Sequence, residues 1–228
     1  MVANRLVSSD IVNSMINFEF SNKSFESQFV PLIEGAYAEA CELLNDDPLK
    51  HILIKFTDNG ASEDTGVGGF ALSSRQLNLA VLEGYRDINT QRENLLGVVY
   101  HELLHIHQGF TYEEAPFTAM EAAMYEGSSI IFEQQYAGAS ASYGDYRQHS
   151  EQELNDWLEE IRSVGVAYFE DSAVWGKWAF YHSEYEQKWL IYKVGSWHVG
   201  RILQENNLDV LDLKDMRTEQ ILALSRSS

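Results

Sequence analysis

Two histidines and a glutamate within five residues are the group in this chain best suited to chemistry. They lie in the sequence His-Glu-Leu-Leu-His, from His101 to His105. Residues four apart in a helix share a face, so both imidazoles can reach one metal ion while Glu102 stands beside them. Because imidazole ligands with an open position are typical of catalytic zinc, we expect one Zn²⁺ ion here.

The surrounding residues predict the helix that this geometry requires. Thr90 and Glu93 have the spacing of a capping box and predict that the helix begins there. Gly109 predicts its end. Between them, apolar residues recur at helical spacing: Leu95, Leu96, Val98, Val99, Leu103, Leu104 and Ile106. An acid buried between two histidines is costly unless it is paired, which favours a metal site over an ordinary core helix.

A catalytic zinc site needs a third protein ligand, and the next residues limit where it comes from. A metzincin would have glycine and histidine where this chain has Gln108 and Thr111. A second helix is predicted to open at Pro116, because proline is favoured in a first helical turn. Glu121 and Glu126 in that helix are both candidate ligands.

The residues around these candidates resemble the gluzincin metallopeptidases. The likeness is to small bacterial families of predicted zinc-dependent proteases and, more distantly, to the aminopeptidase-N-like catalytic domain. The pair Glu126-Gly127, 21 residues after His105, is similar to the element that carries the third ligand in those enzymes. Tyr192, three residues before Gly195, is similar to their transition-state tyrosine. The resemblance covers about residues 52–224.

The resemblance implies a role for each of these residues. The implied zinc ligands are His101, His105 and Glu126. Glu102 would be the general base, and Tyr192 would donate a hydrogen bond to the oxyanion. Tyr192 packed among aromatic residues is an equal alternative. Other residues that could take its role are Tyr181, His182 and Tyr185.

The chain also departs from the family patterns at two places. Thermolysin-type enzymes have an aspartate four residues after the third ligand, and here that residue is Ile130, so the partners of the ligands must differ. Residues 66–72 lack the glutamate with which aminopeptidases hold a free amine. We therefore expect cleavage of internal peptide bonds.

Helical patterns dominate the chain, and strand patterns precede the zinc motif. We expect a helix over residues 24–44, strands over residues 51–56 and 76–82, and a glycine-bearing loop over residues 57–74. Further helices are predicted to begin at Ser150, Ser183 and Thr218. The predicted fold is α+β and mostly helical. A small N-terminal β-sheet packs on the HExxH helix and the C-terminal half is helical, as in zincins, within one domain of residues 1–228.

In the gluzincin arrangement, the last strand before the HExxH helix lies along the cleft, and an extended substrate pairs with its edge. Residues 76–82 are the candidate for that edge strand. An ordinary interior strand is an equal alternative.

Composition narrows the partners. The chain of 228 residues has 35 acidic and 16 basic side chains and a net charge of −19, which excludes nucleic acid and an anionic membrane as partners. One cysteine, Cys41, rules out an intrachain disulfide. Neither an N-terminal apolar segment nor a long apolar run is present, so we expect a cytoplasmic protein.

These features together predict a zinc-dependent peptidase whose partner is a peptide or protein substrate. Two alternatives remain open at this point. The same zinc centre could belong to a hydrolase of a small amide or ester. The width of the cleft would distinguish such an enzyme from a peptidase. A non-catalytic binding or regulatory protein could also keep the motif, although an intact Glu102 favours an enzyme.

Overall fold

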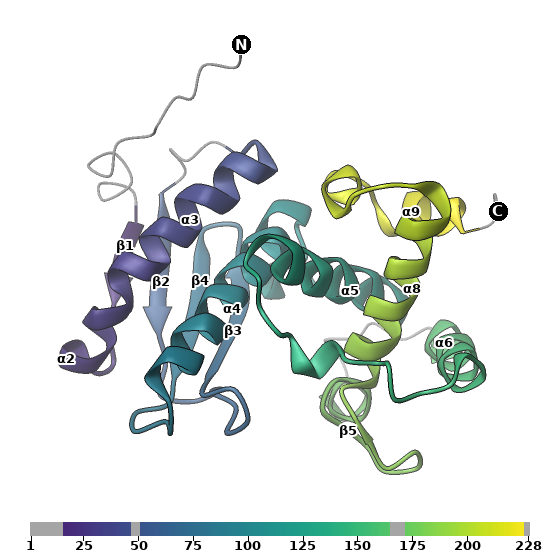
Figure 1. Cartoon of the computed structure of the whole chain (residues 1–228), viewed down its shortest axis with the longest axis horizontal. Coiled ribbons are helices and arrows are strands. Elements are labelled where there is room, and N and C mark those ends of the chain that lie inside the picture. Colours follow the sequence, from purple (N-terminus) through teal and green to yellow (C-terminus); the bar gives the residue numbers. More distant parts are fainter. Residues whose placement is uncertain (1–15, 47–50, 165–171, 226–228) are drawn as a thin grey trace.

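The computed structural model describes residues 16–46, 51–164 and 172–225. A small sheet and two long helices form one end of the molecule, and helices form the C-terminal half (Figure 1). The α+β class, the small N-terminal sheet and the helical C-terminal half are therefore as predicted.

Among the described residues, the main sheet has four strands in the order β1-β2-β4-β3. The strands are β1 (Ile16–Glu19), β2 (Ile52–Phe56), β3 (Val67–Ser73) and β4 (Gln76–Val81). β1, β2 and β4 are parallel, whereas β3 runs antiparallel to β4. β3 is therefore an edge strand, on the side of the sheet nearest the helices that follow in the chain.

One expectation about this sheet was wrong, and the structure decides between two alternatives left open for another strand. Residues 57–74 are not only a loop, because they contain β3, and β4 is an interior strand rather than the edge. Glycines conceal β3 in the sequence because they have low strand propensity. The structure requires them: a Cβ atom on Gly68 would lie 2.0 Å from the carbonyl oxygen of Gly60.

Helices α3 (Val30–Leu44) and α4 (Ile88–Gln108) lie on one face of the sheet (Figure 1). Both have apolar residues at helical spacing, and these pack with the apolar face of β2 and β4. A short helix, α2 (Lys23–Glu26), precedes α3, and Pro31 lies in the first turn of α3. Side chains at the centre of this core include Ile33, Leu44, Ile54, Leu77, Leu79, Leu95 and Leu104.

The helix that carries the HExxH motif begins earlier than Thr90 and ends as predicted. The side chain of Asp87 accepts a hydrogen bond from the backbone N of Asn89 at 2.9 Å and another from the Thr90 hydroxyl at 2.8 Å. Asp87 is therefore the N-cap, and Thr90 supports it from inside the first turn. Gly109, at φ 73°, ends the helix.

The C-terminal half is built around α5 (Ala119–Tyr136). Every residue of α5 from 122 to 133 is buried, and α4 and α8 (Leu190–Asn206) pack directly against it. α6 (Glu151–Val164) and α9 (Thr218–Leu224) complete this half, as Figure 1 shows. α5 begins after Thr118, which forms a capping box with Glu121, and not at Pro116 as expected.

The helices predicted at Ser150 and Thr218 are present, whereas the one predicted at Ser183 is not. Ser150 and Glu153 form the expected capping box before α6. Residues around Ser183 instead form the turn between β5 (Tyr181–His182) and β6 (Gln187–Lys188). Glu186 has φ 53°, which a helix does not allow, so the next helix begins only at Leu190.

α7 (Ser172–Trp175) and a π-helical turn (Gly176–Phe180) lead into this hairpin. Short 3₁₀ turns of three or four residues lie at Ser27–Phe29, Tyr112–Glu114, Ser142–Gly144 and Val210–Leu213. Within the described ranges, no helix is both long enough and apolar enough to cross a membrane.

His198 on α8 makes the fold sensitive to acid. It is 6% exposed, and neither ring nitrogen has a hydrogen-bond partner in the part of the chain that the structure describes. Burial, with smaller contributions from Arg162 and Arg201, lowers the pKa of this imidazole to about 4. Because the unfolded chain binds the proton near pH 6.5 and the folded chain does not, stability falls as the pH drops from about 6.5 to 4.

We therefore predict a smaller effect of acid on the His198→Leu variant. Between pH 7 and pH 4.5, its free energy of unfolding should fall by about 2 to 3 kcal/mol less than that of the unsubstituted protein. Urea unfolding at the two pH values, in the presence of a metal chelator, measures this difference. His51→Leu, at an exposed position, is the matched control. An equal loss of stability in the His198→Leu variant and the unsubstituted protein would contradict the prediction.

Candidate metal centre

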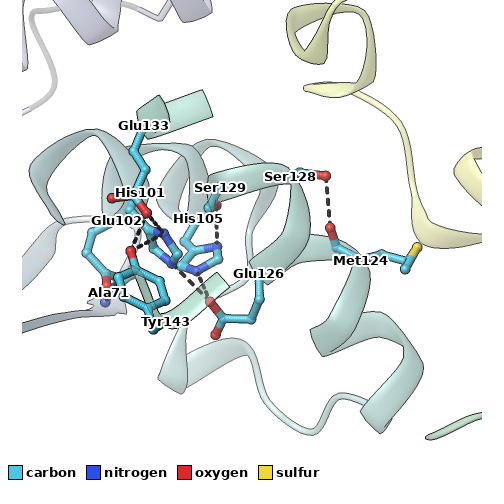
Figure 2. Close-up of polar contacts among 10 residues, drawn as sticks. All are labelled: Ala71, His101, Glu102, His105, Met124, Glu126, Ser128, Ser129, Glu133 and Tyr143. Atoms are coloured by element: carbon cyan, nitrogen blue, oxygen red, sulfur yellow. Dashed lines mark hydrogen bonds and ion pairs between the residues drawn. The ribbon is translucent and has the colours of Figure 1, made fainter. Parts of the chain in front are cut away.

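Three buried side chains from two helices converge on one point. Nε2 of His101 lies 2.9 Å, and Nε2 of His105 3.2 Å, from the same oxygen, Oε2 of Glu126. Potential ligand atoms of all three residues lie within 4.8 Å of one another. Figure 2 shows the two imidazoles of α4 facing the carboxylate from α5. This group could hold a metal ion.

Glu121, the other candidate ligand, has a different role. Its carboxylate accepts hydrogen bonds from the backbone N of Thr118 at 2.7 Å and from the Thr118 hydroxyl at 2.8 Å. The first of these bonds satisfies a backbone donor at the start of α5. The structure therefore brings Glu126, and not Glu121, to the two histidines.

The outer nitrogen of each histidine also has a partner. Nδ1 of His105 lies 3.1 Å from the Ser129 hydroxyl. Nδ1 of His101 lies 3.5 Å from Oε1 of Glu133 and 3.4 Å from the Tyr143 hydroxyl, which itself donates to Glu133 (Figure 2). Partners at Nδ1 hold both rings with Nε2 turned toward Glu126, the orientation that a shared metal ion needs.

Sequence reasoning missed Ser129, Glu133 and Tyr143. Glu133 had a detectable signal, because it follows Glu126 by two helical turns and so shares its face of α5. Glu133 is thus the acidic partner of His101, whereas Ile130, four residues after Glu126, has no side-chain group that could fill this role. Gly97 makes room for Glu133, since a Cβ atom there would lie 2.9 Å from Oε2 of Glu133.

Glu102 stands beside the three converging side chains and is held by the sheet. It is 7% exposed, and its Oε2 accepts a hydrogen bond from the backbone N of Ala71 on β3 at 2.8 Å. Burial raises the pKa of Glu102, although the neighbouring histidines oppose this. A carboxylate with one oxygen fixed and a raised pKa is suited to accepting and returning a proton.

The buried charges of the centre depend on each other. Burial opposes protonation of His101, but hydrogen bonds to Glu126 and Glu133 outweigh it and raise the pKa of the imidazole. Burial likewise opposes ionisation of Glu126, yet His105 and His101 outweigh it and lower the pKa of the carboxyl. Glu126 is thus a carboxylate that needs positive charge beside it, from a protonated histidine or from a metal ion.

A close helix crossing places Tyr192 at the same site. A Cβ atom on Gly127 would lie 2.3 Å from the carbonyl carbon of Gly195, so α5 and α8 touch backbone to backbone there. Gly127 follows Glu126 directly, and Tyr192 precedes Gly195 by about one helical turn. The two glycines therefore bring the tyrosine next to the carboxylate. The rings of Tyr143 and Tyr192 also pack edge to face, with ring centres 5.5 Å apart.

The other residues considered for the role of Tyr192 lie elsewhere. Tyr181 is exposed, His182 is stacked on the ring of Tyr185, and the Tyr185 hydroxyl donates to Glu160 on α6. None of the three lines a cavity that contains the metal centre, whereas Tyr192 lines two.

These two cavities meet at the metal centre and share His101, Glu102 and Tyr192. One has a volume of about 350 Å³ and extends toward the start of β3 and the first half of α4. We call it the polar chamber, after Asp64, Thr65, Thr90 and Asn94, although its wall also contains aromatic side chains such as Tyr85, Tyr143 and Trp189. The other has a volume of about 500 Å³ and extends toward the end of β3; we call it the aromatic chamber, after Phe70, Phe110, Tyr112, Trp175 and Phe180.

Comparison of the chain with known protein families, with curated proteins and with solved structures found no match. The interpretation of the centre therefore depends on its own geometry.

We predict that the protein binds one divalent metal ion and that Glu126→Gln removes it, because the amide is a weaker ligand than the carboxylate. Glu121→Gln, at the cap of the same helix, should retain the metal. Metal content of the purified variants, measured by mass spectrometry, tests this pair. Loss of metal from Glu121→Gln and retention by Glu126→Gln would contradict the assignment.

We further predict that Glu133→Gln lowers metal affinity by roughly 10-fold to 100-fold, because it removes the carboxylate that orients His101. Competition with a chelator of known affinity measures the change. Glu113→Gln, at an exposed position, is the control. Equal affinities of the Glu133→Gln variant and the control would show that Glu133 does not position the ligand.

Proposed function

We propose that this protein is a zinc-dependent peptidase of the gluzincin type, which hydrolyses internal peptide bonds. The observation that carries the proposal is the joint placement of His101, His105 and Glu126 around one point with Glu102 beside it. Two imidazoles, a carboxylate and an adjacent base are the side chains that hydrolysis by activated water requires.

The ligand set fits zinc better than a hard cation. Zinc takes nitrogen and oxygen ligands in small tetrahedral sites, whereas calcium and magnesium favour sites built from several oxygen atoms. The three side chains are buried, and the two histidines are held by outer partners, as in a preformed site. When bound, zinc supplies Lewis acidity, which acidifies a water molecule and polarises a carbonyl group.

Glu102 acts as the general base in this proposal. The backbone N of Ala71 fixes Oε2, so Oε1 is the oxygen that remains for proton transfer. Glu102 takes a proton from the attacking water and returns it to the nitrogen of the leaving amine. Its burial supports this role, because desolvation makes the carboxylate a stronger base than it would be in water.

Tyr192 stabilises the developing oxyanion. Burial, together with the negative charges of Glu126 and Glu102, raises the pKa of Tyr192 well above its usual value, so its hydroxyl stays protonated. A protonated hydroxyl beside the metal centre is a hydrogen-bond donor for the negative oxygen of the tetrahedral transition state.

The outer edge of β3 provides a place for an extended substrate. The backbone N of Leu82 donates to the carbonyl oxygen of Gly66 at 2.9 Å, which fixes the phase of the antiparallel ladder. In such a ladder, alternate residues of β3 direct their backbone N–H and C=O groups toward β4 or away from it. Gly69 and Ala71 direct theirs away from β4, and the backbone N of Ala71 accordingly bonds Glu102. A peptide chain pairs with Gly69, and antiparallel pairing is the more stable arrangement.

The two chambers favour a peptide over a small amide or ester. They extend from the centre in opposite directions along β3, so a chain can continue on both sides of the cleaved bond. In the aromatic chamber, the acids among the described lining residues are Glu102 and Glu126, which already have roles. This composition leaves no acid to hold a free amine and supports cleavage of internal bonds.

Glu102→Gln should abolish hydrolysis while zinc remains bound, because glutamine fills the same space but cannot accept the proton. Zinc content and cleavage of an unbiased peptide library, measured on the same preparation, provide the two readouts. Full activity in this variant would eliminate the mechanism.

Tyr192→Phe should lower kcat by roughly 10²-fold or more, with zinc content and KM little changed, because the hydroxyl acts mainly in the transition state. Peptides blocked at both ends are suitable substrates and should be cut by the unsubstituted enzyme. An unchanged kcat would remove Tyr192 from the mechanism, and strict dependence on a free N-terminal amine would exclude cleavage of internal bonds.

A further inference from the structure

The aromatic chamber carries information about the substrate that the metal centre alone does not. Phe70 on β3 and Phe180 at the end of the π-helical turn are 45% and 56% exposed. Exposed aromatic side chains are costly, and where several border one cavity they mark a binding surface. Both residues lie in the wall of the aromatic chamber, although they are far apart in the sequence.

The chamber is continuous with the proposed catalytic site. Phe110 forms part of its wall and packs on the ligand His105, with ring centres 4.8 Å apart. Phe180 borders both chambers and contacts the ring of Trp175 edge to face. A side chain in this chamber therefore belongs to a residue next to the reacting bond.

The position of the aromatic chamber along β3 determines whether its occupant lies on the amino or the carboxyl side of the cleaved bond. The polar chamber borders β3 from Val67 to Gly69, and the aromatic chamber borders it from Gly68 to Ala71. A peptide that pairs antiparallel with β3 runs from the aromatic chamber toward the polar chamber. Its residues on the amino side of the cleaved bond then lie in the aromatic chamber.

The charge of the chamber excludes an acidic side chain. Among the described residues of its wall, none is lysine or arginine, and two are the glutamates of the catalytic site. An acidic side chain would find no lysine or arginine partner among the described residues of the wall, whereas an apolar one gains contact area with several rings.

From these observations, and resting on the proposed peptidase function, we propose that the protein cleaves peptide bonds that follow a large apolar residue. An aromatic or long aliphatic side chain occupies the aromatic chamber, and Phe70 and Phe180 determine this preference. The polar chamber takes the residues on the carboxyl side.

The test uses blocked five-residue alanine peptides with phenylalanine, lysine, glutamate or alanine at the central position. We expect cleavage after phenylalanine to be fastest. In Phe70→Ala and in Phe180→Ala, the ratio of kcat/KM between the phenylalanine and alanine peptides should fall by about tenfold. Leu82→Ala is the matched control, because Leu82 is an exposed apolar residue outside both chambers.

A binding measurement separates this inference from the function on which it rests. The same peptides are titrated against the zinc-loaded Glu102→Gln variant with and without Phe70→Ala. Cleavage without an apolar preference, or with a preference for lysine or glutamate, would overturn the inference and leave the peptidase intact. If no peptide is cut, the peptidase proposal fails. Tighter binding of the phenylalanine peptide, lost in Phe70→Ala, would then still support the chamber, and equal binding of all peptides would end both proposals.

Discussion

The interaction on which the rest of the structure depends is the contact of the Glu126 carboxylate with two imidazoles inside the molecule. A buried carboxylate is stable only when positive charge and hydrogen bonds offset the loss of water. His101 and His105 supply that contact from α4, and it fixes how α4 and α5 pack together. Two further polar groups of α5, Ser129 and Glu133, support the two histidines from behind.

The same contact links the sheet and the last long helix to the site. Glu102 lies one residue from His101 in α4 and holds the edge strand through Ala71. Gly127 lies one residue from Glu126 in α5 and allows α8 to approach until the backbones touch. β3 and α8 are thus each positioned by a residue adjacent to a proposed ligand, so small shifts in α4 or α5 would move the whole site.

Local patterns in the sequence were sufficient to predict most of the long helices and the HExxH geometry, but not the residues around Ser183, which form a turn instead of the expected helix. Gly109 ends α4 as predicted, because glycine readily adopts the left-handed conformation at a helix end and this depends only on neighbouring residues. The motif resemblance favoured Glu126, and the structure places this residue, rather than Glu121, at the histidines.

Features that depend on distant parts of the chain could not be predicted in this way. β3 is glycine-rich because Gly68 meets the backbone of Gly60, and that approach cannot be read from neighbouring residues. The pairing of β3 outside β4 also depends on the whole sheet, so local patterns could not decide whether residues 76–82 form an edge or an interior strand. Tyr143 reaches His101 from a turn beyond α5, where no spacing rule connects the two.

The most direct test of the account is X-ray absorption spectroscopy at the zinc edge on the purified protein. The protein should contain one zinc per chain, with two nitrogen ligands at about 2.0 to 2.1 Å and carboxylate oxygen at about 2.0 to 2.2 Å. This signal should disappear in Glu126→Gln and persist in Glu102→Gln. Absence of zinc from protein refolded in its presence, or an unchanged ligand set in Glu126→Gln, would contradict the central claim.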